Sequence, residues 1–226
     1  MTATTRDPAR LSDLGVEILD VRDLRGRTPA GVLVVHSIPP DGSPGLLDAL
    51  GDAPARVVYI SSTAVYGEAS VADESTPVDG RTERAAARLA VERSVAAGRW
   101  QSLILRSAAI YGPGRGVQES LQRGACRVDD SFVSRIHVDD LAAHVEAGLL
   151  SEITGAYPVA DEEPCTSREI TEFCAGLLDL PVPASSQAKA RATRRVDGSA
   201  IRRALGITLQ YPSYRVGIPA ALKKLR

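Results

Sequence analysis

Short runs of β-branched and aliphatic residues alternate along this chain with longer segments of helical periodicity. Each run ends in polar or small residues: Val16–Asp20, Gly31–His36, Arg56–Ser61 and Ser102–Arg106. Such alternation is typical of a parallel sheet covered by helices. It predicts an α/β fold whose ligands bind at the carboxyl ends of the strands.

Four segments predict helices: Thr82–Ala97, Asp139–Leu150, Ser167–Leu178 and Ser199–Leu205. Asp139 is expected to be the N-cap of the second helix, and Asp140 suits the positive end of its dipole. After Gly155 the pattern changes and Pro and Ser become frequent. We therefore expect a sheet domain over residues 1–154 and a small C-terminal α+β lobe over residues 155–226, packed together as one compact unit.

The charge balance excludes several classes of partner. Lys and Arg number 27 against 28 Asp and Glu, so no long-range field attracts nucleic acid or an anionic membrane. The apolar runs fall short of the roughly 20 residues that span a bilayer, so we expect a soluble cytoplasmic protein. Three cysteines without a CxxC pair and three histidines predict neither a disulfide framework nor a metal site.

Three segments carry a resemblance to a known family. Arg56–Gly67 reads as a buried strand followed by hydroxyl side chains and a Tyr-Gly turn, Leu105–Gly114 as a second strand with a Tyr-Gly-Pro-Gly turn, and Arg135–Asp140 as the start of a helix. In this order, they resemble the extended short-chain dehydrogenase/reductase superfamily, in particular its NAD(P)-dependent epimerase/dehydratase group. Residues 155–164 resemble the substrate lobe of that family. The resemblance implies a Rossmann-like, doubly wound parallel sheet.

The chain departs from this family at the dinucleotide site. The family opens with a strand and a GxxGxxG turn that holds the pyrophosphate, and no such motif occurs here. Thr2–Leu11 instead resembles the second strand of the family, which implies an N-terminally truncated sheet with a gap at its centre. Three arrangements are consistent with this gap. Either another segment or subunit fills it, or the sheet closes up with Val16–Asp20 nearer Val32–His36, or the reading frame starts upstream. Alternatively, residues 1–10 are a polar tail.

The resemblance implies NADP as the cofactor, bound weakly or not at all, with NAD as the alternative. Arg6 and Arg10 fall where the family meets the 2′-phosphate of NADP, and the strand-end residue His36 falls near the ribose or simply faces solvent. The residues expected to bind the cofactor are Arg6, Arg10, Asp20, His36, Ser61, Tyr111 and Pro113.

A second departure concerns catalysis. Redox members of the family carry a Tyr four residues before a Lys, and those positions hold Arg84 and Arg88 here. Arginine stays protonated and cannot act as a general acid near neutral pH. The two guanidinium groups either clamp an anion or form a solvated face paired with Glu83 and Glu92.

Ser62 matches the catalytic Ser/Thr of the family, although its hydroxyl can also cap the strand end. Tyr66 and Tyr111 are the tyrosines near the expected crevice, where each either donates a proton or packs. The catalytic candidates are Ser62, Thr63, Tyr66, Arg84 and Arg88; the substrate-binding candidates, which are otherwise solvated or structural, are Arg115, Arg135 and His137. The basic stretch Lys189–Arg195 either contacts phosphate or forms a mobile surface loop.

Three functional hypotheses follow. The first is an atypical NAD(P)-binding epimerase/dehydratase acting on a small or nucleotide-linked substrate, with Ser62 polarising a substrate oxygen. The second is a non-redox relative that binds or regulates, or that works in the same crevice without a dinucleotide. The third is an interaction module without pocket chemistry. The alanines of Thr82–Ala97 permit close helix approach and predict a homodimer through this helix.

Overall fold

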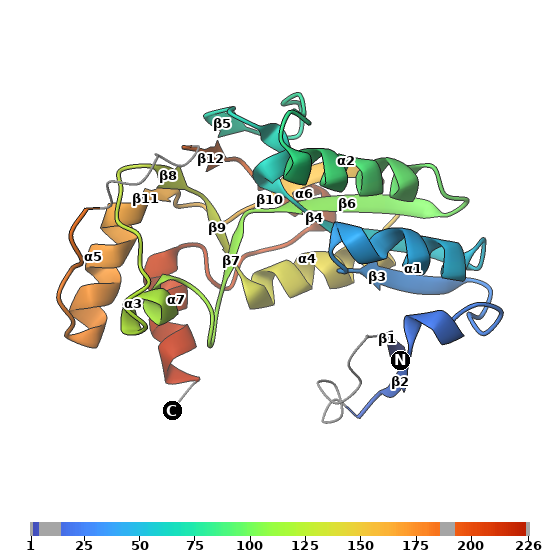
Figure 1. The fold of residues 1–226 in the computed structure, drawn as a ribbon, viewed down its shortest axis with the longest axis horizontal. Coiled ribbons are helices and arrows are strands. Elements are labelled where there is room, and N and C mark those ends of the chain that lie inside the picture. Colours follow the sequence, from blue (N-terminus) through green and yellow to red (C-terminus); the bar gives the residue numbers. More distant parts are fainter. Residues whose placement is uncertain (1, 5–14, 186–192, 225–226) are drawn as a thin grey trace.

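Four parallel strands form the central sheet of the computed structural model, which describes residues 2–4, 15–185 and 193–224 (Figure 1). In spatial order they are β10 (Gly155–Val159), β6 (Gln101–Ser107), β4 (Pro54–Ser62) and β3 (Val32–His36). The strands predicted for β3, β4 and β6 are confirmed. Ser62 pairs with Ser107 in the register of β4 and β6, so hydroxyl side chains end both strands at the same edge.

Helices cover both faces of this sheet. The first face carries α1 (Ser43–Leu50) and α2 (Glu83–Ala96), and the second carries α4 (Val138–Leu150) and α6 (Ser199–Leu205). Consecutive strand residues point to opposite faces, so Val57 packs toward α2 while Val58 packs toward α4. Each fully buried side chain of this kind stabilises the fold by about 1.5–3 kcal/mol.

The first two strands stand apart from the central sheet. β1 (Thr2–Thr4) pairs in parallel with β2 (Glu17–Leu19), and among the described residues no strand joins this pair to β3. The strand predicted at Val16–Asp20 is therefore confirmed, and the sheet does not close up against Val32–His36. Of the arrangements expected from the sequence, the interrupted sheet is the one observed.

A C-terminal lobe packs beside the ends of β4 and β6. The boundary expected at residue 155 does not separate this lobe from the sheet domain, because β10 and α6 follow it and belong with the sheet, whereas residues 117–122 precede it and belong to the lobe. Its helices α3 (Val117–Gln122), α5 (Ser167–Leu178) and α7 (Tyr214–Lys223) share a core with Tyr111. Short strands connect the lobe to the sheet domain: β5 (Val71–Ala72), β7 (Ala109–Tyr111), β8 (Phe132–Val133), β9 (Arg135–His137), β11 (Cys165–Thr166) and β12 (Arg195–Val196). Single 3-10 turns complete the described chain: η2 (Val21–Asp23), η3 (Pro40–Gly42) and η4 (Thr63–Tyr66).

The helix predictions are confirmed for α2, α4, α5 and α6, while α1, α3 and α7 had no clear sequence signal. One detail was wrong. His137 is the N-cap of α4, because its Nδ1 accepts a hydrogen bond from the Asp139 backbone at 3.2 Å. Asp139 and Asp140 instead lie in the first turn, where the helix dipole favours them.

Within the described parts of the chain, no helix has the length and hydropathy needed to cross a membrane. The same residues contain no group of three or more His, Cys, Asp or Glu side chains that could hold a metal ion.

Candidate active site

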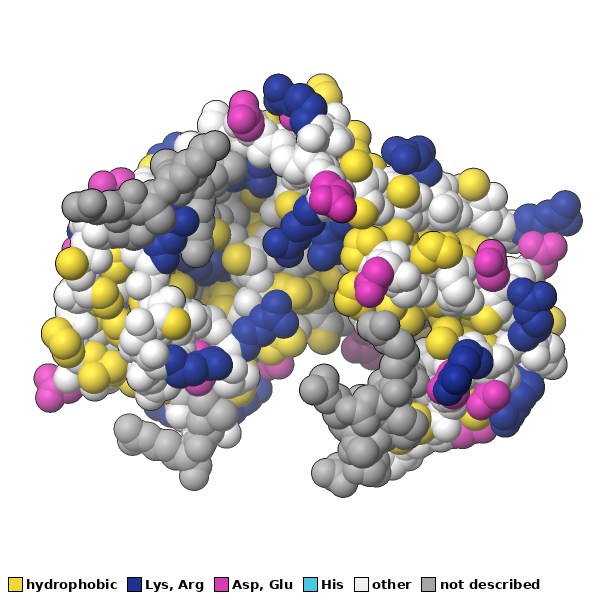
Figure 2. Space-filling model, in the orientation of Figure 1, with side chains coloured by type: hydrophobic (Ala, Val, Ile, Leu, Met, Phe, Trp, Pro, Cys, Tyr) yellow, Lys and Arg dark blue, Asp and Glu magenta, His cyan; other side chains and the backbone are white. Residues whose placement is uncertain are grey.

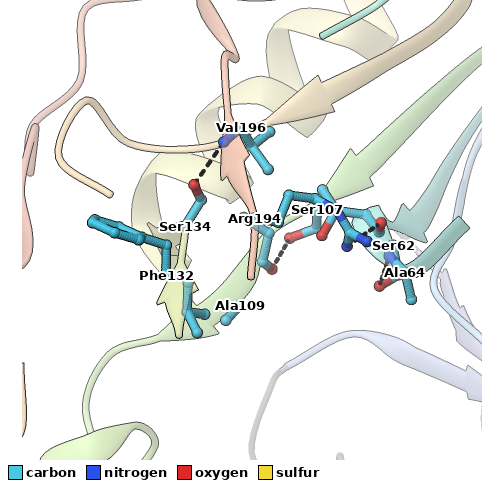
Figure 3. A pocket seen from close by; sticks show the side chains of 11 residues that line it. Ser62, Ala64, Ser107, Ala109, Phe132, Ser134, Arg194 and Val196 are labelled. Carbon is cyan, nitrogen blue, oxygen red and sulfur yellow. Dashed lines mark hydrogen bonds between the residues drawn. The ribbon is translucent and has the colours of Figure 1, made fainter. Parts of the chain in front are cut away.

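A pocket of about 220 Å³ opens where β4 and β6 end and meet the C-terminal lobe (Figure 3). Its walls come from four places: the end of β4 with the turn after it, the end of β6 with the start of β7, β8 with the residue after it, and β12 with the residue before it. The lining residues are Ser62, Thr63, Ala64, Ser107, Ala108, Ala109, Phe132, Val133, Ser134, Arg194 and Val196. The pocket thus lies at the strand edge at which ligands bind in α/β folds.

Ser62 and Thr63 are the two predicted catalytic residues that line this pocket. Ser62 is the last residue of β4, and its Oγ accepts a hydrogen bond from the backbone N–H of Ala64 at 3.2 Å. The expected capping role is therefore present. Because this bond uses the oxygen as acceptor, the hydroxyl proton of Ser62 is still available to a substrate oxygen.

Ser61 does not line the pocket. Neighbouring strand residues point to opposite faces, so the Ser61 hydroxyl turns toward α2 and donates to Oε1 of Glu92 at 2.6 Å. Nη2 of Arg106 donates to Oε2 of the same carboxylate at 2.8 Å, and both charged side chains are buried. Ser61, expected to bind a cofactor, thus belongs to a buried ion-pair network.

Tyr66 belongs to the same network. It is 1% exposed, and its hydroxyl accepts a hydrogen bond from Nη1 of Arg106 at 3.4 Å. Burial raises the pKa of Tyr66, while the Arg106 guanidinium opposes the shift. The side chain therefore packs beneath the turn after β4, as the alternative reading expected.

Arg84 and Arg88 lie on α2 and do not line the pocket. Arg84 is exposed, whereas Arg88 is half-buried beside the Tyr59 hydroxyl, where its charge opposes the burial that raises the pKa of Tyr59. Glu92, expected as their partner on a solvated face, is buried and pairs with Arg106 instead. That part of the prediction was wrong, because α2 turns Glu92 toward the sheet.

The residues expected to bind a cofactor are dispersed. Asp20 caps the turn η2 and pairs with Arg22 at 2.7 Å, and His36 is fully buried against Tyr59 with ring centroids 4.7 Å apart. The expectation that His36 faces solvent was therefore wrong, and burial lowers its pKa to about 4. Arg6 and Arg10 lie outside the described residues.

Tyr111 and Pro113 flank the turn after β7. The Tyr111 hydroxyl donates to the carbonyl of Ser213 at 3.2 Å and lies against Gly217 of α7, where a Cβ would overlap it. Burial raises the pKa of Tyr111. Pro113 is half-buried, and neither residue lines the pocket.

The three residues expected to bind substrate also lie outside the pocket lining. Arg115 is exposed in the loop before α3. Arg135 is buried, and its Nη1 donates to the carbonyl of Val133 at 2.7 Å and to Sγ of Cys165 at 3.1 Å. His137 is buried as the cap of α4, which is the structural role that the sequence left open.

Several lining residues had not been singled out in the sequence. Ser107 directly follows a predicted strand, and that position was the available signal. Arg194 belongs to the basic stretch expected to contact phosphate or form a mobile loop, yet it is half-buried and donates to three backbone carbonyls. Phe132, Ser134 and Val196 come from short strands and their connections, which have no periodicity of their own.

A dinucleotide needs a pyrophosphate cradle of backbone N–H groups, usually built on closely spaced glycines at a helix N-terminus. Within the described residues, no GxxGxxG turn follows a strand of the central sheet, and no strand lies in the gap between the β1–β2 pair and β3. The closely spaced Gly112, Gly114 and Gly116 instead precede the short helix α3 of the lobe. The hydroxyl-lined pocket suits a small substrate, and none of the described residues that line it is a glycine of the kind that lets a backbone approach a pyrophosphate.

The network under the pocket predicts a large stability effect. Glu92→Gln leaves the buried Arg106 charge uncompensated, so we expect the free energy of unfolding to fall by about 3–5 kcal/mol in urea denaturation. Glu83→Gln removes an exposed carboxylate from the same helix and should cost less than about 1 kcal/mol. Equal effects of the two substitutions would contradict this role of Glu92.

A second prediction concerns Asp161, which is 3% exposed just after β10. Burial raises its pKa to about 8, with the charge of Arg135 opposing the shift. A folded-state pKa above the unfolded value means that stability falls as pH rises from about 4 to about 8, by at most about 1.4 kcal/mol per pH unit. Asp161→Asn should remove this decline in denaturation curves recorded at pH 5, 6.5 and 8. An unchanged pH slope would show that Asp161 does not cause it.

Comparison with known proteins agrees with this architecture. The model of the NAD dependent epimerase/dehydratase family matches residues 41–148, which include the end of β4, α2 and the end of β6. A curated relative, the 3-diazoavenalumate denitrifying reductase of a Streptomyces species, is 28% identical over 239 residues, covering 89% of this chain and 77% of the relative.

Two solved structures are similar over nearly the whole chain. A conserved protein of unknown function from Silicibacter pomeroyi DSS is 31% identical, with a TM-score of 0.83 over 98% of this chain and 89% of its own. A candidate NAD-dependent epimerase/dehydratase from Methylobacillus flagellatus is 27% identical, with a TM-score of 0.78 over 99% and 89%. With its three motifs at the strand ends, the chain belongs to the NAD-dependent epimerase/dehydratase family of the extended short-chain dehydrogenase/reductase superfamily.

Proposed function

We propose that the pocket at the ends of β4 and β6 is the substrate site of a small-molecule enzyme, in which Ser62 polarises a substrate oxygen. The observation that carries this proposal is the bond between Ser62 Oγ and the Ala64 backbone, because it orients the hydroxyl and leaves its proton free. Thr63 lines the same wall. A hydroxyl held in this way is oriented before the substrate arrives, which reduces the cost of alignment.

In redox members of the family, a Tyr four residues before a Lys, on the helix that corresponds to α2, supplies the proton. In our proposal α2 does not supply a proton to the reaction. Arg84 and Arg88 stand at those positions, and a guanidinium is not a proton donor near neutral pH. Tyr66 and Tyr111 are buried in other contacts. The similarity to a curated relative named as a reductase supports an oxidoreductase more than an epimerase, and a reduction would require NADPH or NADH as the hydride donor.

Dinucleotide binding by this chain is weak or absent in our proposal, with NADP preferred over NAD if any binds. The lack of a glycine cradle supports weak dinucleotide binding. The sequence positions of Arg6 and Arg10 support the preference for NADP over NAD. The same lack of a cradle favours a second candidate function, a non-redox protein that binds or converts its ligand in this pocket without a cofactor. A cytoplasmic location remains a prediction.

Titration with NADPH and NADH, followed by nicotinamide fluorescence, tests the cofactor proposal. We expect no saturation below the micromolar range, because the pyrophosphate lacks its backbone N–H donors. A submicromolar Kd for either nucleotide would contradict the proposal. Because the titration needs no substrate, its outcome does not depend on the pocket assignment.

We also propose a homodimer formed through α2. Ala86, Ala87 and Ala90 are exposed on this helix and would let a second copy approach closely. Light scattering at micromolar concentration should give twice the 23.9 kDa of one chain. Ala86→Glu with Ala90→Glu should return the mass to that of one chain, and a dimer that tolerates both changes would exclude this helix as its interface.

A further inference from the structure

Arg194 places a positive charge in the wall of the pocket. It precedes β12, and Figure 3 shows its guanidinium directed toward the turn after β4. Nε donates to the carbonyl of Ala69 at 3.1 Å, Nη1 to that of Thr63 at 2.8 Å, and Nη2 to that of Gly67. These bonds use three of the five N–H groups of the guanidinium, so two remain for other partners.

This charge has no acidic partner in the described chain. No Asp or Glu among the described residues forms an ion pair with Arg194, and the eleven residues that line the pocket include no Asp or Glu. Burial lowers the pKa of Arg194, but a guanidinium remains protonated at neutral pH. On the face shown in Figure 2, further Lys and Arg side chains gather around the central hollow. A half-buried cation beside an open pocket favours an anionic group in that pocket.

Two serine hydroxyls add hydrogen-bond donors to the same pocket. Ser62 Oγ accepts from the Ala64 backbone at 3.2 Å, and Ser134 Oγ accepts from the Val196 backbone at 2.8 Å. Both oxygens are thus engaged as acceptors, and both protons are free to be donated. The Ser62 hydroxyl and the Arg194 guanidinium, which lie beside each other in Figure 3, suit a group that only accepts hydrogen bonds, and an ionised carboxylate is such a group; Ser134 offers its proton from the opposite wall.

The size and the remaining walls define the rest of the ligand. Phe132, Val133 and Val196 are apolar lining residues, so the pocket has room for an apolar body beside the polar wall. The volume of about 220 Å³ lies below the 300–1,000 Å³ of sites for drug-sized ligands. A small organic acid fits within this volume, whereas a nucleotide-linked sugar would have to extend beyond it.

We propose that the pocket binds a small organic acid, whose carboxylate is held by the Arg194 guanidinium and by the hydroxyl of Ser62. The inference rests on the proposed function in using the same pocket, and it narrows the substrate class from small or nucleotide-linked molecules to small carboxylates. Arg194 is here a binding residue that also fixes the turn carrying Thr63 and Gly67.

Calorimetric titration of the full chain with cinnamate, cinnamamide and UDP tests the proposal without cofactor or turnover. Cinnamate and its amide share size and apolar body but differ in charge. We expect cinnamate to bind at least tenfold more tightly than cinnamamide, and UDP not to displace it. Equal binding of acid and amide, no binding of the acid, or displacement by UDP would each overturn the proposal. The titration contains no dinucleotide, so its outcome does not depend on whether the chain binds NADPH or NADH.

Variants then assign the charge to Arg194. Arg194→Gln should abolish the preference for the acid, and Arg194→Lys should retain part of it. Arg203→Gln removes an exposed arginine of α6 that does not line the pocket, and it should leave the preference unchanged. If Arg194→Gln lacks the circular dichroism of the folded chain, Ser62→Ala decides. It removes one donor and should weaken cinnamate more than cinnamamide, and an equal effect on both ligands would contradict the assignment.

Discussion

The carboxylate of Glu92 accepts hydrogen bonds from two strands of the central sheet and so ties α2 to the floor of the pocket. Ser61 reaches it from β4 and Arg106 from β6, and Arg106 also contacts the hydroxyl of Tyr66 in the turn that follows β4. Charges this deeply buried are tolerated only when they are paired and hydrogen-bonded. The position of Ser62, one residue beyond Ser61, therefore depends on an ion pair on the opposite face of the sheet.

Arg194 holds the same turn from the other side. Its three bonds to backbone carbonyls join the segment before β12 to residues that follow β4, and β12 itself pairs with β5. The turn is thus fixed between a side chain of the sheet domain and one of the lobe. A pocket between two such supports requires that both parts of the chain fold before the site exists, because neither part supplies the walls alone.

Much of the fold could be predicted from the sequence, because strands and helices leave local periodic patterns. The runs around Val57 and Leu103 predicted β4 and β6, and the helical pattern of Thr82–Ala97 predicted α2. The site was harder to predict. Arg194 contacts a residue 131 positions away, and Glu92 binds an arginine 14 positions away on another element. No local pattern records such pairings, so Arg194 was grouped with the surface loop and Glu92 with a solvated helix face.

Two candidate site residues make structural contacts for a common reason. His137 and Ser61 were considered for the chemistry of their side chains, and in the structure they satisfy a helix end and a buried carboxylate. A side chain that is able to bind a ligand is equally able to bind its own backbone, and only the fold decides between the two. Ser62 is able to do both, since its oxygen caps η4 while its proton stays free.

The interrupted sheet also bears on how the chain behaves in solution. Within the described residues β3 pairs only with β4, and Leu33 and Val35 along it are 45% and 43% exposed. An apolar strand with a free edge is a template onto which another strand can add through backbone hydrogen bonds. At high protein concentration such edges meet more often, which favours intermolecular β-structure over the monomeric fold. The yield of correctly folded chain should therefore depend on protein concentration.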